Sequence, residues 1–361
     1  MAERRYTTAD FDYPLPDELI AQVPSRVRGE SRLLVVDRAQ HAAQRPQPPA
    51  PPRGAAAGFA DRSFSDIISL IPSGDLVVVN STKVRHARLL GSRPGGGPAE
   101  VLLLHPLGDD SWLAMGKPGR ALQPGKRIVL GHGVEIETVA VQHDGYRQVR
   151  FVGADAASAI ARFGQLPLPP YIEREPTAED EERYQTIYAA REASVAAPTA
   201  GLHFTHEIVA QLVTNGVAFV EIDLEVGPGT FKPVETELID EHPMHAERFD
   251  IPPHAATQIA AARQRGAKVW AVGTTVVRAL ESAATGDGTV RAGQQETSLL
   301  IAPGFQFRVV DHLLTNFHLP RSTLLMLVAA FAGHDHTMAA YHHAVAARYR
   351  FYSYGDAMCI L

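Results

Sequence analysis

The sequence predicts an α/β protein: a main α/β domain whose strands end in ligand-binding turns, with a small antiparallel β-barrel inserted into it. Several apolar, β-rich runs end in small polar residues and are followed by a helical pattern. Between residues 91 and 152 short β runs follow one another without a helical period. We therefore expect a discontinuous main domain, residues 1–90 and 153–361, and a barrel domain, residues 91–152.

In the main domain, four apolar runs lead into turns rich in Gly, Thr, Asn or Ser. They are Leu76–Val79, Ala218–Val226, Val269–Val272 and Leu313–Leu314. The expected turns are 80–82, 227–229, 273–275 and 315–316, with helices over 276–284 and, after Pro320, over the apolar run Leu324–Ala332. Ligands bind beyond the carboxyl ends of parallel strands, and free N–H groups at helix starts can hold an anion.

In the insert, the expected strands are separated by Gly, Pro or Asp clusters. They are Glu100–Leu104, Trp112–Met115, Arg127–Leu130, Val134–Val141 and Gln148–Val152. The segment 39–62, before the first turn, is rich in Ala, Pro, Gln and Arg. Such a composition buries too little apolar surface to order itself, so we expect an exposed, disordered loop there.

The composition limits the class of protein. Its 361 residues allow a sizeable core and two domains, and a hydrophobic content of 45% is ordinary for a globular protein. The longest apolar run is too short to cross a membrane, and the polar start predicts no signal peptide. A single cysteine, Cys359, excludes a disulfide framework and argues against a thiolate zinc site. We expect a cytoplasmic protein.

The net charge of −6 does not favour nucleic-acid binding, but the charge is unevenly placed. From Lys83 to Arg150 there are ten Lys or Arg and six Asp or Glu, whereas Glu173–Glu182 holds six acids and one Arg. Any RNA footprint is therefore expected as a local patch around the first stretch, part of it on the barrel. Solvated surface charge is the alternative.

The stretch Ser194–Thr205, SVAAPTAGLHFT, combines many small residues with His203. Small residues let a backbone approach a ligand closely, and a histidine there can move a proton near neutral pH. This stretch resembles the signature of the S-adenosylmethionine:tRNA ribosyltransferase-isomerases of queuosine biosynthesis. Further motifs follow in family order along nearly the whole chain: 10–24, 76–90, 166–172, 183–188, 226–234, 242–245, 271–282, 315–333 and 348–358.

The resemblance implies a transferase-isomerase that moves the ribosyl part of S-adenosylmethionine onto the aminomethyl group of preQ1, a 7-deazaguanine at the wobble position of a tRNA. The ribose rearranges to give epoxyqueuosine, and adenine and methionine leave. S-adenosylmethionine is then a co-substrate with no permanently bound cofactor, and family members are usually monomers. The family is described as an α/β domain with an inserted β-barrel, in agreement with the fold expected from the pattern.

This reaction needs proton transfer and a clamp for the methionine carboxylate and ammonium groups. The candidates for proton transfer are His203 and His318, each of which has a structural alternative as an ordinary buried or loop histidine. The candidates for binding S-adenosylmethionine come from the stretch 194–205, from two predicted turns and from the helices expected after these turns. They are Thr199, Gly201, Thr274, Thr275, Arg278, Asn316 and Arg321. Arg321 is expected in a first helical turn, where a cation opposes the helix dipole and so suggests another duty.

Lys83, Arg85 and Arg88 follow the first turn and are candidates for RNA binding, with a solvated helix face as the alternative. His242 and His245 have a spacing that invites a metal, but nothing nearby completes a ligand set, so no metal site is expected. Family members commonly carry a histidine where this chain has Glu225. Glu225 is a third catalytic candidate, as a base, or it marks a paralogue with another acceptor; a non-catalytic RNA-binding protein is a further alternative.

Overall fold

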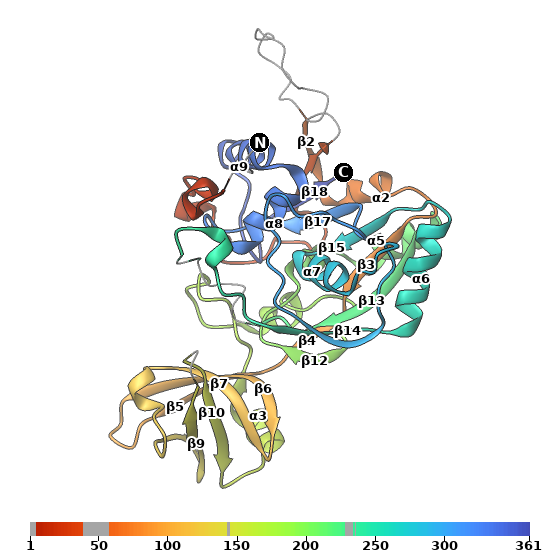
Figure 1. The fold of residues 1–361 in the computed structure, drawn as a ribbon. Coiled ribbons are helices and arrows are strands. Elements are labelled where there is room, and N and C mark those ends of the chain that lie inside the picture. The colour runs from red at the N-terminus through yellow and green to blue at the C-terminus, as the bar shows by residue number, and fades with distance from the viewer. Residues whose placement is uncertain (1–4, 39–57, 143–144, 228–233, 235) are drawn as a thin grey trace.

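A mixed sheet of nine strands forms the centre of the larger part of the molecule (Figure 1). The computed structural model describes residues 5–38, 58–142, 145–227, 234 and 236–361, and structural statements concern these residues. In spatial order the strands are β16 (Gly293–Thr297), β14 (Glu247–Ile251), β13 (Ala218–Leu224), β3 (Leu76–Asn80), β15 (Val269–Val272), β17 (His312–Asn316), β18 (Ala357–Ile360), β1 (Arg32–Val36) and β2 (Phe59–Ser63).

The four neighbouring strands β13, β3, β15 and β17 are parallel to one another, whereas β14, β16, β18 and β2 each add an antiparallel pairing. Parallel strands end at the same edge of a sheet. The turns after β13, β15 and β17 therefore meet at one edge, as the sequence predicts.

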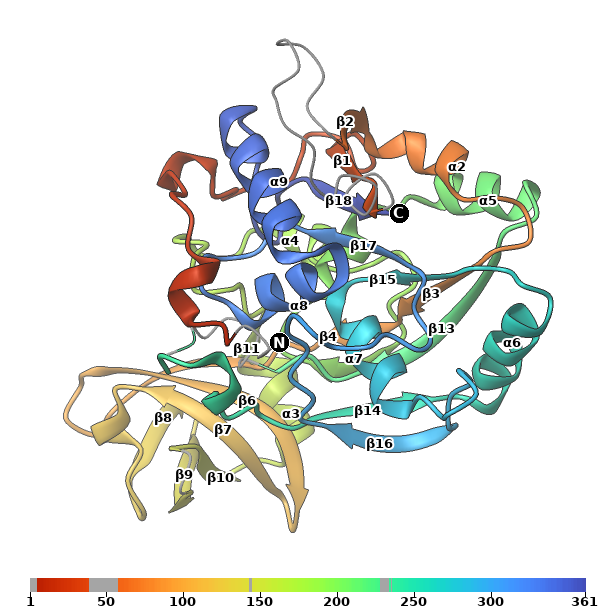
Figure 2. The ribbon, with the colours of Figure 1, turned by 45° about the horizontal axis from the view of Figure 1, so that its top comes forward.

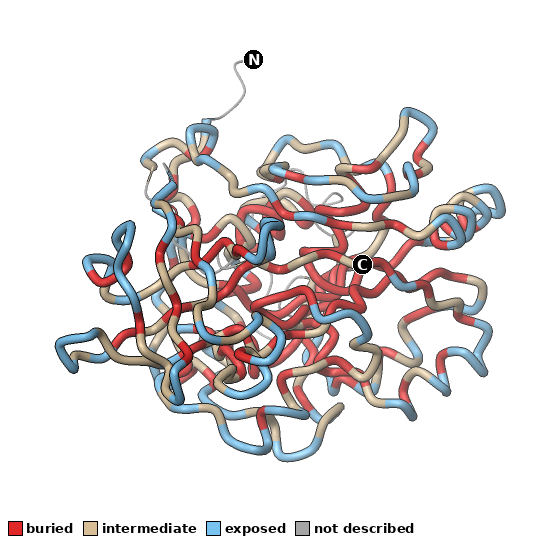
Figure 3. Tube along the Cα trace, turned by 90° about the horizontal axis from the view of Figure 1, so that it is seen from below, coloured by how far each residue is buried: buried red, intermediate tan, exposed pale blue. Residues whose placement is uncertain are grey.

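Helices cover both faces of this sheet (Figure 2). Residues of β3 alternate between the faces: Leu76 and Val78 pack on one side, and Val77 and Val79 on the other. On the first side lie α6 (Pro253–Gln264), α7 (Thr274–Ala283), α8 (Thr323–Ala332) and α9 (His334–Ala346); on the second lie α2 (Ile67–Leu70) and α5 (His206–Thr214). Buried backbone gathers in the centre of the molecule, and exposed backbone lies at its periphery (Figure 3). Within the described ranges, no helix is long and apolar enough to cross a membrane.

The smaller part is an antiparallel barrel. Its strands are β5 (Arg88–Ser92), β6 (Pro98–Gly108), β7 (Ser111–Lys117), β10 (Arg147–Val152), β9 (Val134–Val141) and β8 (Arg127–Gly131), and pairing of β5 with β8 closes the ring. β11 (Gly164–Gln165) pairs on the outside with β5. Ile160 and Phe163 of α3 (Ala156–Phe163) pack against the barrel core. The predicted α/β protein with an inserted antiparallel barrel is confirmed.

Three local predictions are wrong. The turn after β3 leads not into a helix but into β4 (Thr82–Val84), which pairs with β12 (Arg191–Ser194). The reason is Asn80, whose Oδ1 accepts hydrogen bonds from the N–H groups of Thr82 and Leu224 and holds the chain extended. Helix α8 begins at Thr323 because Ser322 caps it, so Pro320 and Arg321 precede the helix and do not form its first turn as expected. The end of the predicted disordered loop 39–62 forms β2, which pairs with β1; residues 39–57 lie outside the described residues.

The carboxylate of Asp180 ties the C-terminal segment to the short helix α4 (Ala178–Arg183). It is fully buried and accepts hydrogen bonds from the Arg174 guanidinium at 2.6 and 2.8 Å, from the Tyr354 hydroxyl at 2.6 Å and from Thr177 at 2.7 and 2.9 Å. Burial alone would raise the pKa of Asp180, but hydrogen bonds from Arg174 and Tyr354 outweigh it and hold the pKa well below its usual range.

We expect Asp180→Asn to lower the free energy of unfolding by about 2–3 kcal/mol near neutral pH, because buried donors lose a charged acceptor. A carboxylate whose pKa is lower in the folded state stabilises above its unfolded pKa of about 4 and loses that effect as the pH falls. The difference between variant and parent in urea unfolding should therefore shrink below about pH 4. Glu179→Gln, an exposed neighbour paired with Arg183, is the control, and an equal loss there would contradict the assignment.

Candidate functional site

The ends of β13, β15 and β17 surround a cavity, named here the strand-end cavity. Five of the predicted site residues line it: Thr199, Thr274, Thr275, Asn316 and His318. Tyr171, Tyr352 and Ser353 close it from segments distant in sequence, and the rings of Tyr171 and Tyr352 stack with centroids 4.2 Å apart. The predicted turns 273–275 and 315–316 therefore meet in one place, with Val226 from the segment after β13.

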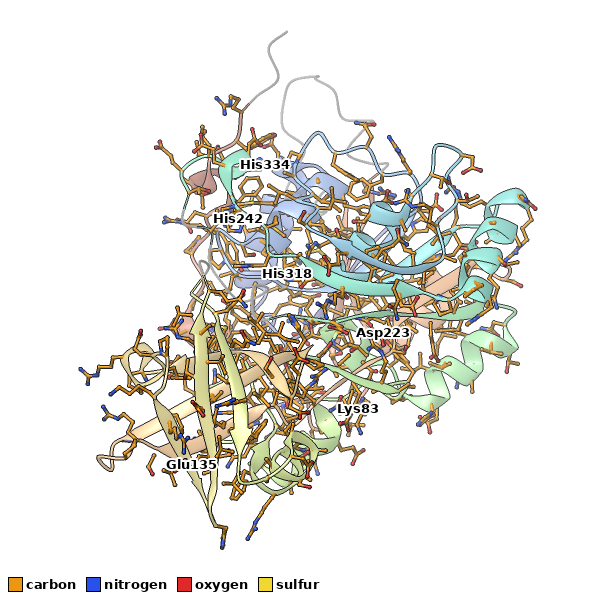
Figure 4. All side chains as sticks on the ribbon, turned by 60° about the horizontal axis from the view of Figure 1, so that its bottom comes forward. Lys83, Glu135, Asp223, His242, His318 and His334 are labelled. Atoms are coloured by element: carbon orange, nitrogen blue, oxygen red, sulfur yellow. The ribbon has the colours of Figure 1, made fainter. Side chains whose placement is uncertain are left out.

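A second cavity of about 250 Å³, named here the barrel cavity, lies between the barrel and the sheet. The barrel contributes Leu104, His105, Leu113 and Tyr146. The α/β part contributes Glu225, Glu247, Arg278, His242 and His245. Val226 and Leu324 line both cavities, so the two adjoin. Figure 4 labels His242 and His318, both on the α/β part, and Glu135 on the barrel.

Buried polar atoms without a partner mark both cavities. Among the residues that the structure describes, Asn316 Oδ1, Thr275 Oγ1 and the Tyr352 hydroxyl in the strand-end cavity make no hydrogen bond. In the barrel cavity the same holds for Arg278 Nη2. An unpaired buried polar group costs about 1–3 kcal/mol, so such atoms at a cavity wall indicate a place for a ligand.

Arg278 lies on α7 and forms a buried ion pair with Glu247 at the start of β14. Its Nε also donates to the Leu299 carbonyl at 3.3 Å, and its Nη2 makes no hydrogen bond with a described residue. Glu247 Oε1 accepts the N–H of Gly227 at 3.5 Å. Residues 228–233, which include the last two residues of the predicted turn 227–229, lie outside the described residues.

Glu225 lines the barrel cavity, and Arg191 binds it at 3.3 Å. Arg191 binds Asp223 more closely, at 2.6 Å. The carboxylate of Glu225 therefore faces the cavity with one exposed cation as a partner.

His318 lines the strand-end cavity and its Nε2 lies 2.8 Å from Thr315 Oγ1. Burial lowers the pKa of His318 to about 3, so the ring is neutral near pH 7. It can exchange hydrogen bonds with a ligand but does not carry an extra proton at neutral pH.

His203 lies behind the cavity wall and lines neither cavity. Its Nδ1 is 2.6 Å from Ser31 Oγ, its Nε2 is 3.2 Å from Asn316 Nδ2, and its ring stacks on Phe64. Burial, with Arg28 and Arg350 nearby, lowers the pKa of His203 to about 3. Both ring nitrogens are thus engaged within the protein.

Two predicted binding residues do not reach the cavities. Gly201 packs so closely on Tyr188 that an added Cβ would lie 2.3 Å from its hydroxyl, so this glycine serves internal packing. Arg321 precedes the N-cap Ser322 with φ 57°, outside the first helical turn where we expected it, and is 55% exposed. The carboxylate that Arg321 binds is Asp12 of the same chain.

None of the three predicted RNA-binding cations lies on a helix: Lys83 is on β4, Arg88 is on β5, and Arg85 is in the segment between these strands. Arg85 is buried and donates to the carbonyl groups of Glu192 and Ala193 at 3.2 and 2.7 Å, so it presents no charge to a phosphate. Lys83 pairs with Glu192 at 2.8 Å, and Arg88 pairs with Glu175 and Glu100. The side chain of Lys83 keeps 40% exposure.

Several residues of this site were not singled out from the sequence, among them Ser31, Tyr171 and Tyr352, and Glu247 was considered only beside His242 and His245 as a metal ligand. Tyr171 and Tyr352 lie in motifs 166–172 and 348–358 of the family resemblance, and this membership could have identified them as site residues. Ser31 lies in none of the motifs. Among the described residues, no group of three His, Cys, Asp or Glu side chains could hold a metal ion.

Comparison with known proteins gives consistent matches along the chain. The model of the family described as queuosine biosynthesis protein matches residues 8–360. A relative from Anaeromyxobacter sp. (strain Fw109-5) is 49% identical over 98% of both chains, and one from Symbiobacterium thermophilum is 49% identical over 98% of this chain and 99% of its own; both are named S-adenosylmethionine:tRNA ribosyltransferase-isomerase.

A crystal structure of S-adenosylmethionine tRNA ribosyltransferase from Thermotoga maritima is also similar. It is 36% identical, covers 98% of this chain and 100% of its own, and has a TM-score of 0.53. The chain therefore belongs to the queuosine biosynthesis protein family, the family of the S-adenosylmethionine:tRNA ribosyltransferase-isomerases.

Proposed function

We propose that this chain transfers and isomerises the ribosyl part of S-adenosylmethionine onto the aminomethyl group of preQ1 at the wobble position of a tRNA. The products are epoxyqueuosine in the tRNA, adenine and methionine. The observation that carries the proposal is the pair of adjoining cavities at the carboxyl ends of parallel strands, in a chain of this family. S-adenosylmethionine is consumed as a co-substrate.

The two cavities suit the two ends of such a substrate. The unpaired Nη2 of Arg278 offers a charge-assisted hydrogen bond to a carboxylate such as that of the methionyl part. The strand-end cavity offers the Thr275 hydroxyl and the Asn316 amide oxygen, with neutral His318 beside them. Glu225 is then the carboxylate placed to accept a proton from the barrel cavity.

We propose that the protein acts as a monomer, as the resemblance to the family implies. Because the substrate is a tRNA, we propose that the reaction occurs in the cytoplasm. For tRNA binding, the barrel offers Lys117, Arg120 and Lys126 between β7 and β8, which are exposed and have no ion pair with the part of the chain that the structure describes. Lys83, at the base of the barrel, is the predicted cation that remains exposed enough to join them.

The function is tested by mass analysis of preQ1-containing tRNA after incubation with the protein and S-adenosylmethionine. We expect epoxyqueuosine in the tRNA, with adenine and methionine released in equal amounts. Adenine release without a modified nucleoside, or with an acceptor other than preQ1, would instead identify a paralogue. Binding of tRNA without any product would identify an RNA-binding protein.

We expect Arg278→Lys to lower kcat/KM for S-adenosylmethionine by about 30-fold or more, because lysine keeps the charge beside Glu247 but loses the fork that also reaches the ligand. The measurement is initial rate of adenine release at saturating preQ1-tRNA. Arg263→Lys, a partly exposed arginine that pairs with Asp311 and lines neither cavity, is the control. Equal effects of both changes would remove Arg278 from the site.

For tRNA binding, we expect replacement of Lys117, Arg120 and Lys126 by alanine to weaken affinity and to reduce the slope of log K against log salt by about 2–3. Filter binding at several salt concentrations measures this slope. Arg127→Ala with Arg150→Ala is the matched control on the same barrel, since Glu135 and Glu137 already pair with these cations. A larger slope change in the control would place the RNA on another face.

A further inference from the structure

Four groups behind the strand-end cavity form one hydrogen-bonded chain: Ser31 Oγ, the His203 ring, the Asn316 amide and the Tyr352 carbonyl. The nitrogen of the Asn316 amide, Nδ2, lies 3.0 Å from the Tyr352 carbonyl oxygen and 3.2 Å from His203 Nε2. A carbonyl oxygen can only accept, so the amide group facing it must be the NH₂. This contact fixes which way the Asn316 amide points.

The orientation of the amide in turn fixes the histidine. Because Nδ2 is a donor, His203 Nε2 must accept, and the ring proton must sit on Nδ1, where Ser31 Oγ is 2.6 Å away. A second ring proton would set an N–H against the amide NH₂. Stacking on Phe64 with centroids 5.0 Å apart holds the plane of the ring.

The other atom of the amide, Asn316 Oδ1, is left at the cavity. Asn316 is 2% exposed and lines the strand-end cavity, and Oδ1 makes no hydrogen bond with any described residue. Tyr352, whose carbonyl sets the arrangement, has φ 71°, which is rare for a bulky side chain. Strain at such a position, next to an unpaired buried acceptor, is typical of a site shaped for a ligand.

We propose that His203 is a positioning residue, a neutral Nδ1–H imidazole that holds the Asn316 amide so that Oδ1 accepts a hydrogen bond from an N–H group of bound S-adenosylmethionine. The inference rests on the proposed function for the identity of the ligand. It replaces the proton-transfer role expected for His203, because both ring nitrogens are occupied inside the protein. The N–H group belongs either to the α-ammonium of the methionyl part or to the 6-amino group of adenine.

The tautomer is measured first, in the protein alone, by long-range ¹H–¹⁵N correlation spectra between pH 6 and 8. The His203 signals are those that His203→Gln removes. We expect the pattern of a neutral ring protonated on Nδ1 throughout this range. An Nε2–H ring or an imidazolium would overturn the proposal. This measurement does not depend on which reaction the enzyme catalyses.

Kinetics then test positioning against proton transfer, at saturating preQ1-tRNA. We expect Asn316→Ala and His203→Leu each to raise KM for S-adenosylmethionine about 10-fold or more, and the double variant to be no worse than Asn316→Ala. His203→Gln should recover most of the loss, because its side-chain oxygen can accept from Asn316 Nδ2. His312→Leu, a change at the opposite end of β17, is the control and should leave KM unchanged.

Two results would overturn the proposal in favour of proton transfer. One is a double variant in which the effects of the two single changes on KM add up. The other is a His203→Gln enzyme with a normal KM but a kcat as low as that of His203→Leu. Two analogues of S-adenosylmethionine, one without the α-ammonium group and one without the 6-amino group, identify the donor. For the analogue that lacks the group bound by Asn316, Asn316→Ala should cause no further rise in KM. A further rise in KM with both analogues would exclude this contact. If the parent protein forms no epoxyqueuosine, the proposed function fails, while the tautomer still decides the role of His203.

Discussion

The structure depends on one constraint: four parallel strands, β13, β3, β15 and β17, must end at the same edge of the sheet. Each strand is short and buried, so it cannot stand alone and takes its place from its neighbours. Residues more than a hundred positions apart, such as Thr199 and Asn316, line one cavity because their segments meet there. The barrel departs from the same region after Asn80, which places its inner end against the turn that follows β13.

What the sequence predicted well is what depends on local pattern. Alternating or continuous apolar runs gave the main strands, and the helix α8 followed from an apolar run of nine residues, Leu324–Ala332. The wrong predictions concern segments whose conformation depends on a partner distant in the sequence. Asn80 looks like a helix cap in the sequence, but its amide binds Leu224 across 144 residues, and this bond turns the chain into a strand. Phe59–Ser63 orders because β1 offers it an edge.

The site shows the same division. The predicted turns that carry Thr274, Thr275 and Asn316 lie at the strand-end cavity, because turns that follow neighbouring parallel strands meet at one edge of a sheet. The sequence could not show which residues line the strand-end cavity and which lie behind its wall. Small residues surround both Thr199, which lines the cavity, and His203, which lies behind the wall. Arg321 pairs with Asp12, and Arg85 donates to backbone carbonyl groups. No local sequence pattern predicts these partners.

The buried pair of Arg278 and Glu247 joins the fold to the site. Taking two charges out of water costs several kcal/mol per ion, and such a pair is often no more stabilising than apolar residues of the same volume. Stability alone therefore does not account for it. Glu247 also accepts the N–H of Gly227, and Arg278 Nη2 has no hydrogen-bond partner in the part of the chain that the structure describes. Glu247 already orients the Arg278 guanidinium group, so a ligand group that binds Nη2 does not have to order this side chain.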